Sequence, residues 1–146
     1  MPAWLATGYQ EFASRLPSHC QLKLVEIPAV KRGKRPDPRA IEIEGDRLLT
    51  AIPKAARVVA LDLAGQQWST EQLTQQLANW LQSGQDVALL VGGADGLSQA
   101  CKQRAQQTWA VSRLTFPHLL MRVLLAEQLY RAWSLLNHHP YHRATP

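Results

Sequence analysis

Short apolar runs that alternate with helix-forming patterns constrain the fold of this chain more than any other feature. Three such runs lie at residues 57–63, 86–91 and 111–116, and a helical pattern separates each from the next. Apolar runs of this length fill strands that are covered on both faces. Strands separated by helices pair in a parallel or mixed sheet with helices on both faces. We therefore expect an α/β layered sandwich built on a mostly parallel sheet.

Start and stop signals mark the expected helices. The clearest helix begins at Ser69, where Ser69-Thr70-Glu71-Gln72 has the form of a capping box, and Gly84 ends it. Gly65 is expected to close the strand before this helix. The remaining elements are predicted as helices at 1–16, from Pro38 to about 52, at 98–107 and at 117–137, and as a further strand at 21–27.

The chain has 146 residues and contains neither an internal repeat nor a linker, so we expect a single domain over residues 1–146. Its apolar stretches are broken by charge within about ten residues, whereas a membrane helix needs about 20, and we expect no membrane span. The N-terminus lacks a signal-peptide pattern, and Cys20 and Cys101 stand apart without a CxxC motif. These features favour a reducing, cytoplasmic location.

Basic residues outnumber acidic residues by 16 to 11, which gives a net charge of +5 at pH 7. This excess favours a polyanionic partner, with nucleic acid as the leading candidate. Lys31, Arg32, Lys34 and Arg35 surround Gly33 in a loop bordered by prolines, and such a loop can contact phosphates. The alternative is a solvated run of charge. Residues 86–100 carry neither Lys nor Arg, which suggests a second surface with a different partner.

A glycine-rich turn, residues 92–96, follows the second apolar run and precedes a helix. Open α/β sheets bind ligands at this position, beyond the carboxyl ends of strands. The spacing does not match a dinucleotide fingerprint because Ala94 occupies a required glycine position, and the Gly-Lys-Ser/Thr of a P-loop does not follow. The lack of cations in the turn argues against a phosphate-rich cofactor. A ligand loop and a tight turn that needs a positive φ both remain open.

The C-terminal segment 138–143 combines three imidazoles, a phenol and a guanidinium. A zinc site through His139 and His142 is conceivable, but no cysteine or carboxylate lies nearby and a proline breaks the helix, so we expect no metal. The segment is then either a frayed end or an active-site tail. The preceding helix spaces Glu127 and Arg131 four residues apart, and it holds more apolar residues than one face can bury, which predicts a partner subunit.

Several blocks of residues occur along nearly the whole chain in the order typical of one known family. The blocks are Lys31-Arg32-Gly33-Lys34, Leu61-Asp62, Leu89-Leu90-Val91-Gly92-Gly93, Gly96-Leu97-Ser98, Leu114-Thr115-Phe116-Pro117-His118, Arg122-Val123-Leu124, Ala126-Glu127, Leu129-Tyr130-Arg131-Ala132-Trp133-Ser134 and His139-Pro140-Tyr141-His142-Arg143. The chain resembles the ribosomal large-subunit methyltransferases H of the SPOUT class, which methylate N3 of a pseudouridine in 23S ribosomal RNA.

This resemblance implies a layered α/β sandwich with a C-terminal trefoil knot, a homodimer and S-adenosylmethionine as cofactor. In the family the cofactor lies among the loops that follow three strands. The corresponding residues here are Leu61, Gly92, Val111, Ser112, Arg113, Leu114, Thr115 and Phe116. A cofactor without phosphate agrees with the cation-free glycine turn.

The resemblance also implies roles for polar side chains near the C-terminus. Tyr141 or His142 would accept the N3 proton or orient the uracil edge, and Arg143 would stabilise the developing negative charge. In an antiparallel dimer, the cofactor of one subunit and the tail of its partner would form one site. The basic loop would hold the RNA backbone of the ribosome. The candidate catalytic residues are Tyr141, His142, Arg143, Glu127, Arg131 and His118.

Two departures from the family pattern are visible. Ala94-Asp95 stands where the family more often has Pro-Glu. Family members also begin with a short strand of about ten residues that this chain, read from Met1, does not include, and we expect its absence to expose backbone groups of a neighbouring strand. Two other functions are considered, a non-catalytic ribosome-binding or RNA-binding protein and an α/β dinucleotide oxidoreductase. Cofactor binding separates them from a methyltransferase.

Overall fold

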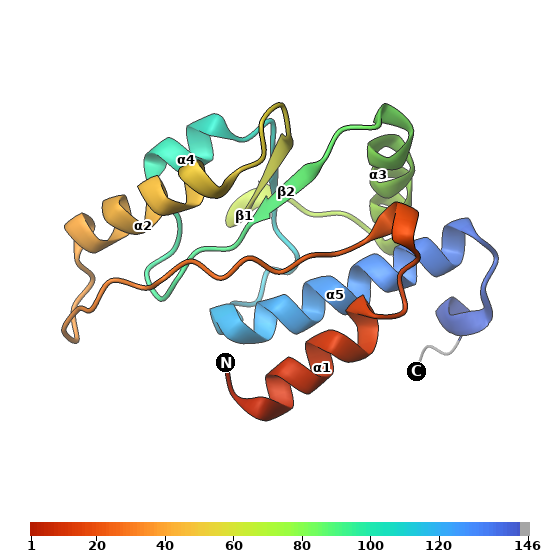
Figure 1. Ribbon diagram of the computed structural model, residues 1–146, viewed down its shortest axis with the longest axis horizontal. Coiled ribbons are helices and arrows are strands. Elements are labelled where there is room, and N and C mark those ends of the chain that lie inside the picture. The colour runs from red at the N-terminus through yellow and green to blue at the C-terminus, as the bar shows by residue number, and fades with distance from the viewer. Residues whose placement is uncertain (144–146) are drawn as a thin grey trace. The chain divides into compact units, whose positions relative to one another are not determined.

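The computed structural model describes residues 1–143, with side chains described as far as Tyr141. The described chain divides into two compact units, each assembled from separate stretches of sequence. The sheet unit contains residues 25–67 and 85–118. The helical unit contains residues 1–24, 68–84 and those from 119 onward. Figure 1 shows the elements of both units in chain order by colour.

The sheet unit is built on three parallel strands within the described residues, in the order β2-β1-β3. The strands are β1 (Arg57–Gln66), β2 (Val87–Leu90) and β3 (Gln107–Trp109). The central strand pairs Val59 with Leu89 on one side and with Gln107 on the other. Val58, Val59 and Ala60 are fully buried. The all-parallel pairing confirms the α/β expectation and explains why this run is apolar without alternation.

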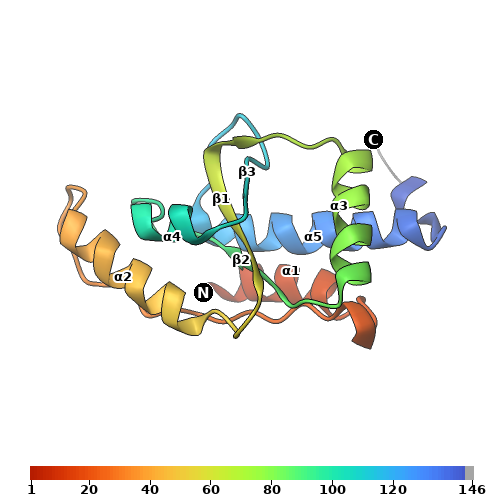
Figure 2. The same cartoon turned by 90° about the horizontal axis from the view of Figure 1, so that it is seen from above.

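Two helices, α2 (Pro38–Ala51) and α4 (Gln99–Arg104), pack together in the sheet unit, and Figure 2 shows them side by side. Leu48 and Leu49 of α2 pack on a buried cluster that contains Val58 and Cys101. A methyl group at Gly45 would collide with Ser98, so glycine permits the close approach of α2 to the start of α4. This packing holds the residues just after β2 against α2.

The helical unit contains α1 (Ala3–Ala13), α3 (Thr70–Ser83) and most of α5 (His118–Leu136), with the short helices η1 (Ser18–Cys20) and η2 (Pro140–Arg143). In α1, Leu5 and Tyr9 are buried as the helical spacing predicts. A methyl group at Gly8 would lie 3.4 Å from Val123 Cγ1, which shows how closely α1 approaches α5. The capping box of α3 is present, with Gly84 in the left-handed conformation at its end, and both predictions are confirmed.

Two predicted strands are wrong. Residues 21–27 belong to neither a helix nor a strand, although Leu22, Leu24 and Ile27 are half-buried between exposed neighbours. The alternation is thus retained without a hydrogen-bonded partner strand in the described chain. The third strand is Gln107–Trp109 instead of 111–116. Residues 111–116 form a loop, where the Leu114 N–H donates to the Ser112 hydroxyl oxygen at 3.0 Å.

Three boundaries also differ from the predictions. The first helix ends at Ala13, before residue 16, and α4 ends at Arg104, because Gln107 already pairs with Val59. Strand β1 continues through Gly65 to Gln66, where its carbonyl accepts from the Ala110 N–H at 2.8 Å. Glycine at position 65 allows β1 to lie close to β3, because a Cβ there would lie 2.6 Å from the Thr108 carbonyl group. The expectation of a single domain stays a prediction.

Candidate functional site

The glycine turn lies directly after β2, at the carboxyl end of the parallel sheet. Gly93 and Gly96 form an antiparallel bridge, in which the Gly96 N–H donates to the Gly93 carbonyl at 3.1 Å. Gly96 has φ of +85°, and a Cβ on Gly92 would lie 2.5 Å from the Gly96 carbonyl carbon. The tight-turn interpretation is therefore confirmed. Gly92, Gly93 and Gly96 themselves carry no side chain that would keep a ligand from the backbone.

The positions expected to hold the cofactor lie in or after three neighbouring strands of one unit. Leu61 lies in β1 just beyond the residues that pair with β2, Gly92 follows β2, and residues 111–116 follow β3. Because the strands are parallel, their carboxyl ends share one edge of the sheet. Leu61 and Gly92 are half-buried, whereas Leu114 is 68% exposed. The sheet thus brings the three segments to the same end.

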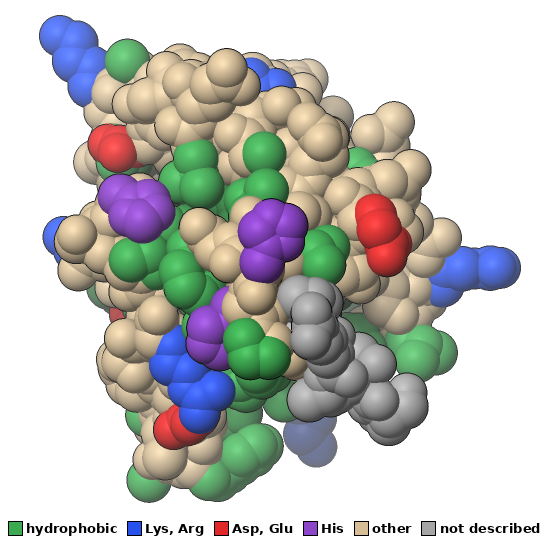
Figure 3. Space-filling view, turned by 90° about the vertical axis from the view of Figure 1, so that its right-hand side faces the viewer, with side chains coloured by type: hydrophobic (Ala, Val, Ile, Leu, Met, Phe, Trp, Pro, Cys, Tyr) green, Lys and Arg blue, Asp and Glu red, His purple; other side chains and the backbone are tan. Residues whose placement is uncertain are grey.

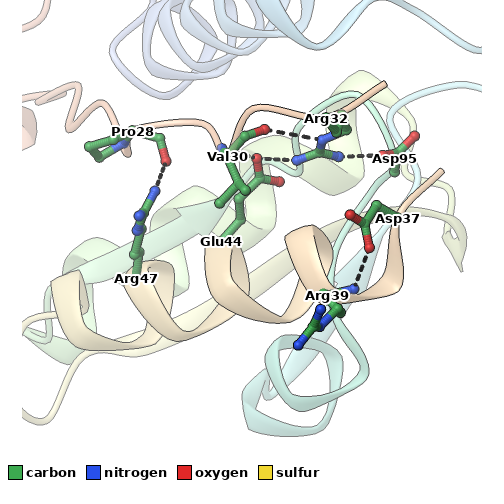
Figure 4. Close-up of polar contacts among 8 residues, drawn as sticks. All are labelled: Pro28, Val30, Arg32, Asp37, Arg39, Glu44, Arg47 and Asp95. Atoms are coloured by element: carbon green, nitrogen blue, oxygen red, sulfur yellow. Dashed lines mark hydrogen bonds and ion pairs between the residues drawn. The ribbon is translucent and has the colours of Figure 1, made fainter. Parts of the chain in front are cut away.

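Arg32 of the basic loop reaches into the structure and joins two acidic residues (Figure 4). Its guanidinium donates one N–H to the Glu44 carboxylate and another to the Asp95 carboxylate, and its Nε donates to the Val30 carbonyl at 3.3 Å. The three charged side chains are between 11% and 16% exposed. Hydrogen bonds to Glu44 and then to Asp95 raise the pKa of Arg32. Arg32 therefore links the basic loop, helix α2 and the glycine turn.

Glu44 has one carboxylate oxygen committed and one free. Its Oε2 accepts from Arg32 and from the Val30 N–H, the latter at 2.9 Å. Its Oε1 is buried without a hydrogen-bond partner among the described residues, and a Cβ on Gly93 would lie 3.2 Å from it. A buried acceptor of this kind is costly unless something donates to it. This oxygen is therefore an unsatisfied buried acceptor beside the glycine turn.

The other cations of the basic loop are differently placed. Lys31, Lys34 and Arg35 are exposed, on the same loop whose Arg32 is largely buried. The start of the loop is tied to α2, because Arg47 donates to the Pro28 carbonyl at 2.7 Å. The exposed cations are thus free to contact phosphates from a loop that is anchored at its base and through Arg32.

A second group of candidate residues lies in the helical unit, around the end of α5. Arg131 Nε donates to both oxygens of Glu127, at 3.1 and 3.3 Å. The Arg131 guanidinium also lies 5.1 Å from the centre of the Tyr141 ring, and the Tyr141 ring is 4.7 Å from the Tyr130 ring. The ion pair and the aromatic contacts together hold the tail against α5.

The environment of Tyr141 affects its chemistry. Burial, and then the negative charge of Glu127, raise the pKa of the Tyr141 phenol. The Tyr141 N–H donates to His139 Nδ1 at 3.3 Å, and the His139 ring lies 6.1 Å from that of Tyr130. Figure 3 views the right-hand side of Figure 1, where the end of α5 lies, and shows apolar and histidine side chains close together on that side. The phenol therefore stays protonated to a higher pH than that of an exposed tyrosine.

The remaining candidates are placed as follows. His118 begins α5 and is half-buried in the sheet unit. The backbones of His142 and Arg143 lie in η2, and their side chains lie outside the described residues. Among the residues that the structure describes, no group of three or more His, Cys, Asp or Glu is arranged to hold a metal ion. Nor does any helix in residues 1–143 have the length and apolarity to cross a membrane.

Comparison with known proteins identifies the family. A family model described as "Predicted SPOUT methyltransferase" matches residues 1–142. The chain belongs to the SPOUT methyltransferase family. Proteins named "Ribosomal RNA large subunit methyltransferase H" are similar over 98–99% of the chain. The relative from Thioalkalivibrio sulfidiphilus is 59% identical, and the match spans 92% of its length. The relatives from Marinomonas sp. and Alkalilimnicola ehrlichii are 55% and 57% identical, and each match spans 93% of the relative's length.

A SPOUT methyltransferase requires a methyl donor, and the glycine turn has features that fit one. The backbone of Gly92 is half-buried, and the Oε1 of Glu44, which lacks a hydrogen-bond partner among the described residues, lies beside Gly93. Residues 86–100 carry neither Lys nor Arg, and the Arg32 guanidinium that reaches the turn is committed to Asp95 and Glu44, so this arrangement does not favour a phosphate group. The glycine spacing also does not match a dinucleotide fingerprint.

Sequence reasoning missed Glu44 and Asp95 as the partners of Arg32. The sequence did indicate that Glu44 lies on the buried face of its helix, because it follows Ile41 by three residues and precedes Leu48 by four. A carboxylate within the apolar stripe of a helix is buried and needs a partner. Asp95 carried no comparable signal, since an acidic residue in a turn is ordinarily solvated. In this SPOUT methyltransferase, tertiary contact alone assigns it to Arg32.

Proposed function

We propose that this SPOUT methyltransferase transfers a methyl group from S-adenosylmethionine to N3 of a pseudouridine in 23S ribosomal RNA. The proposal is supported by the strand register, which puts Leu61, Gly92 and residues 111–116 toward the same end of a parallel sheet, in a chain of this family. The relatives' printed name, a methyltransferase of large-subunit ribosomal RNA, supports the class of substrate. It also disfavours a non-catalytic RNA-binding protein or a dinucleotide oxidoreductase.

The residues of the sheet unit would bind the cofactor. S-adenosylmethionine supplies a sulfonium group whose methyl is open to attack by a nitrogen nucleophile. The backbone at Gly92 and the loop 111–116 would enclose it, and Leu61 and Leu114 would provide apolar contact. Glu44 Oε1 would accept a hydrogen bond from an amino or hydroxyl group. Holding the donor in one orientation favours transfer by proximity.

The basic loop would hold the RNA. Lys31, Lys34 and Arg35 are exposed, and cations of this kind neutralise phosphates without reading the sequence. Arg32 would act differently, since its guanidinium is committed to Glu44 and Asp95. The choice of one pseudouridine then depends on groups that contact the base itself.

The tail would act on the base. The N3 proton must leave, and we assign its removal to His142, because histidine is the most common general base, whereas a phenol with a pKa above 10.0 is protonated at neutral pH. Tyr141 would instead donate a hydrogen bond that orients the uracil edge. Arg143 would stabilise negative charge on the base. Glu127 and Arg131 would hold the tail in place through the Tyr141 ring.

We further propose the features that the family resemblance implies for the assembly, namely a cytoplasmic homodimer with a C-terminal trefoil knot. The apolar side chains in the first half of α5 support a partner subunit, because Leu119, Leu120, Met121 and Val123 are half-buried within one chain. Covering such surface stabilises association. The tail of each subunit would then serve the cofactor site of its partner.

Calorimetric titration of the folded protein with S-adenosylmethionine tests the proposal, with NADH as the control ligand. We expect S-adenosylmethionine to bind and NADH not to bind. Incubation with large ribosomal subunits and free 23S RNA then measures methyl incorporation at N3 of pseudouridine. A folded protein that binds RNA but not S-adenosylmethionine would be a non-catalytic binding protein, and one that binds NADH would favour an oxidoreductase.

A further inference from the structure

We propose that Arg32 is a positioning residue that couples RNA binding at the basic loop to cofactor binding at the glycine turn. The inference rests on the proposed function, because it takes the turn as the cofactor site and the loop as the phosphate site. It goes further by predicting that each ligand raises the affinity for the other. The contacts of Arg32, Glu44 and Asp95 in Figure 4 carry the argument.

The Arg32 side chain extends from the same loop as two exposed cations. Its neighbours Lys31 and Lys34 are exposed, while its own side chain is 11% exposed and bound to two carboxylates. Phosphates that bind Lys31 and Lys34 would therefore restrict the backbone from which the Arg32 side chain extends. An arginine that serves two carboxylates depends on its position, since its N–H groups have a fixed planar geometry.

The Arg32 guanidinium holds both the glycine turn and Glu44. One of its N–H groups binds Asp95, which lies within the turn itself. The turn has little freedom to absorb a shift, because a Cβ on Gly92 would already overlap Gly96. Another N–H group binds Glu44 Oε2, and the same oxygen accepts from the Val30 N–H. The orientation of the free Glu44 Oε1 beside Gly93 is thus set by two residues of the loop.

A ligand that favours the loop position in which Arg32 holds Asp95 and Glu44 also raises the population of the arrangement that binds the second ligand, which makes binding positively cooperative. Such coupling must be equal in both directions, and typical values change affinity by roughly 5-fold to 150-fold. We expect a uridine oligoribonucleotide to increase the affinity for S-adenosylmethionine by about 5-fold or more.

The experiment measures the S-adenosylmethionine dissociation constant by calorimetry with and without saturating uridine oligoribonucleotide. The variant Asp95→Ala breaks the link to the turn while leaving the Arg32–Glu44 pair intact. We expect it to bind both ligands with the coupling factor reduced to about one, the value for independent sites. Asp95→Glu retains the carboxylate and should retain most of the coupling. Asp86→Ala, which removes an exposed carboxylate elsewhere in the sheet unit, is the matched charge control and should couple as the wild type does.

Arg32→Lys provides a second test that does not depend on Asp95. A lysine keeps the positive charge but lacks the fork that binds two carboxylates, so the coupling factor should again fall. Thermal unfolding confirms that each variant is folded. Wild-type coupling in both Asp95→Ala and Arg32→Lys would overturn the inference, as would cofactor binding by the wild type that the oligoribonucleotide does not change. A folded wild type that fails to bind S-adenosylmethionine would overturn the proposed function instead.

Discussion

At the scale of single residues, this chain uses glycine where two backbones approach and uses buried charge where two segments must be joined. Gly65 lies against the Thr108 carbonyl group, and Gly92 lies against Gly96. Arg32 is charged and largely buried, and it is stabilised by two carboxylates from different segments. Removing one partner of such a network leaves a buried charge unpaired, which costs more than the loss of an exposed pair.

The close approach at Gly65 gives a prediction for stability. A Cβ in Gly65→Ala would lie 2.6 Å from the carbon and oxygen of the Thr108 carbonyl, so β1 and β3 must separate. We expect a loss of about 1–3 kcal/mol in the free energy of unfolding, measured by urea denaturation. Gly33→Ala is the matched control, because nothing lies within 4 Å of its Cβ position. Equal stability of the two variants would contradict the expected clash.

The raised pKa of Tyr141 gives a prediction for pH dependence. Burial, followed by Glu127, raises this pKa above the ordinary value of 10.0, so the phenol stays protonated when an exposed tyrosine ionises. The unfolded chain ionises first, and the contribution of Tyr141 to stability is therefore lost as the pH rises above 10.0. The ultraviolet difference titration between wild type and Tyr141→Phe should show a midpoint above that value. A midpoint at or below it would remove the argument that Tyr141 donates a hydrogen bond.

At the scale of elements, α3 shows how local signals define a helix. Ser69 Oγ accepts from the Gln72 N–H at 3.1 Å, and Gln72 Oε1 accepts from the Ser69 N–H at 2.9 Å. Gly84 ends the helix with φ of +73°. Leu73, Leu77 and Trp80 form the buried face between these two ends. Caps and apolar spacing agree, which is why the sequence predicted this helix well.

Removal of the cap should weaken α3 by a modest amount. Ser69→Ala removes the acceptor of the Gln72 N–H, and we expect the free energy of unfolding to fall by about 1 kcal/mol. Gln82→Ala, an exposed change near the other end of the same helix, serves as control. Thermal and urea unfolding of both variants measure the difference. If Ser69→Ala unfolds no earlier than Gln82→Ala, the capping box contributes nothing to the stability of this unit.

At the scale of the whole molecule, the proposed chemistry divides between the two units. The turn, the basic loop and residues 111–116 belong to the sheet unit, whereas Glu127, Arg131 and the tail belong to the helical unit. The proposed roles are correspondingly separate, with cofactor and RNA backbone assigned to one unit and the base assigned to the other. Binding of the cofactor and turnover should therefore be separable by mutation.

Deletion of the chain from His139 onward tests this separation. We expect methylation of large ribosomal subunits to be abolished, because the proposed base and its orienting groups are removed, while the affinity for S-adenosylmethionine changes less than about 2-fold, which is within the error of additive, independent sites. A variant that lacks residues 144–146 alone is the control and should retain activity. Turnover by the longer deletion would exclude the tail from catalysis, and loss of cofactor binding would show that the two units act together.

The sequence by itself determined the elements whose signals are local. Capping residues, prolines and apolar spacing at three or four residues predicted α2, α3 and α5, and the apolar run at 57–63 predicted the central buried strand. The ordered blocks along the chain predicted the family. Such signals are local because a cap or a buried face is formed by residues close in sequence.

Tertiary structure alone decided which residues meet. Gln107 and Thr108 look unlike a buried strand, yet they pair with β1, and the more apolar residues 111–116 form a loop. From the sequence, Arg32 was predicted to be one of four solvated or phosphate-binding cations. In the structure α2 and the glycine turn both approach it, and its guanidinium binds Glu44 and Asp95. The two ion pairs of Arg32 join residues 12 and 63 positions apart in the sequence, and strand pairing joins Val59 to Gln107. The sequence therefore shows that a buried charge or strand needs a partner, but it does not show which residue the partner is.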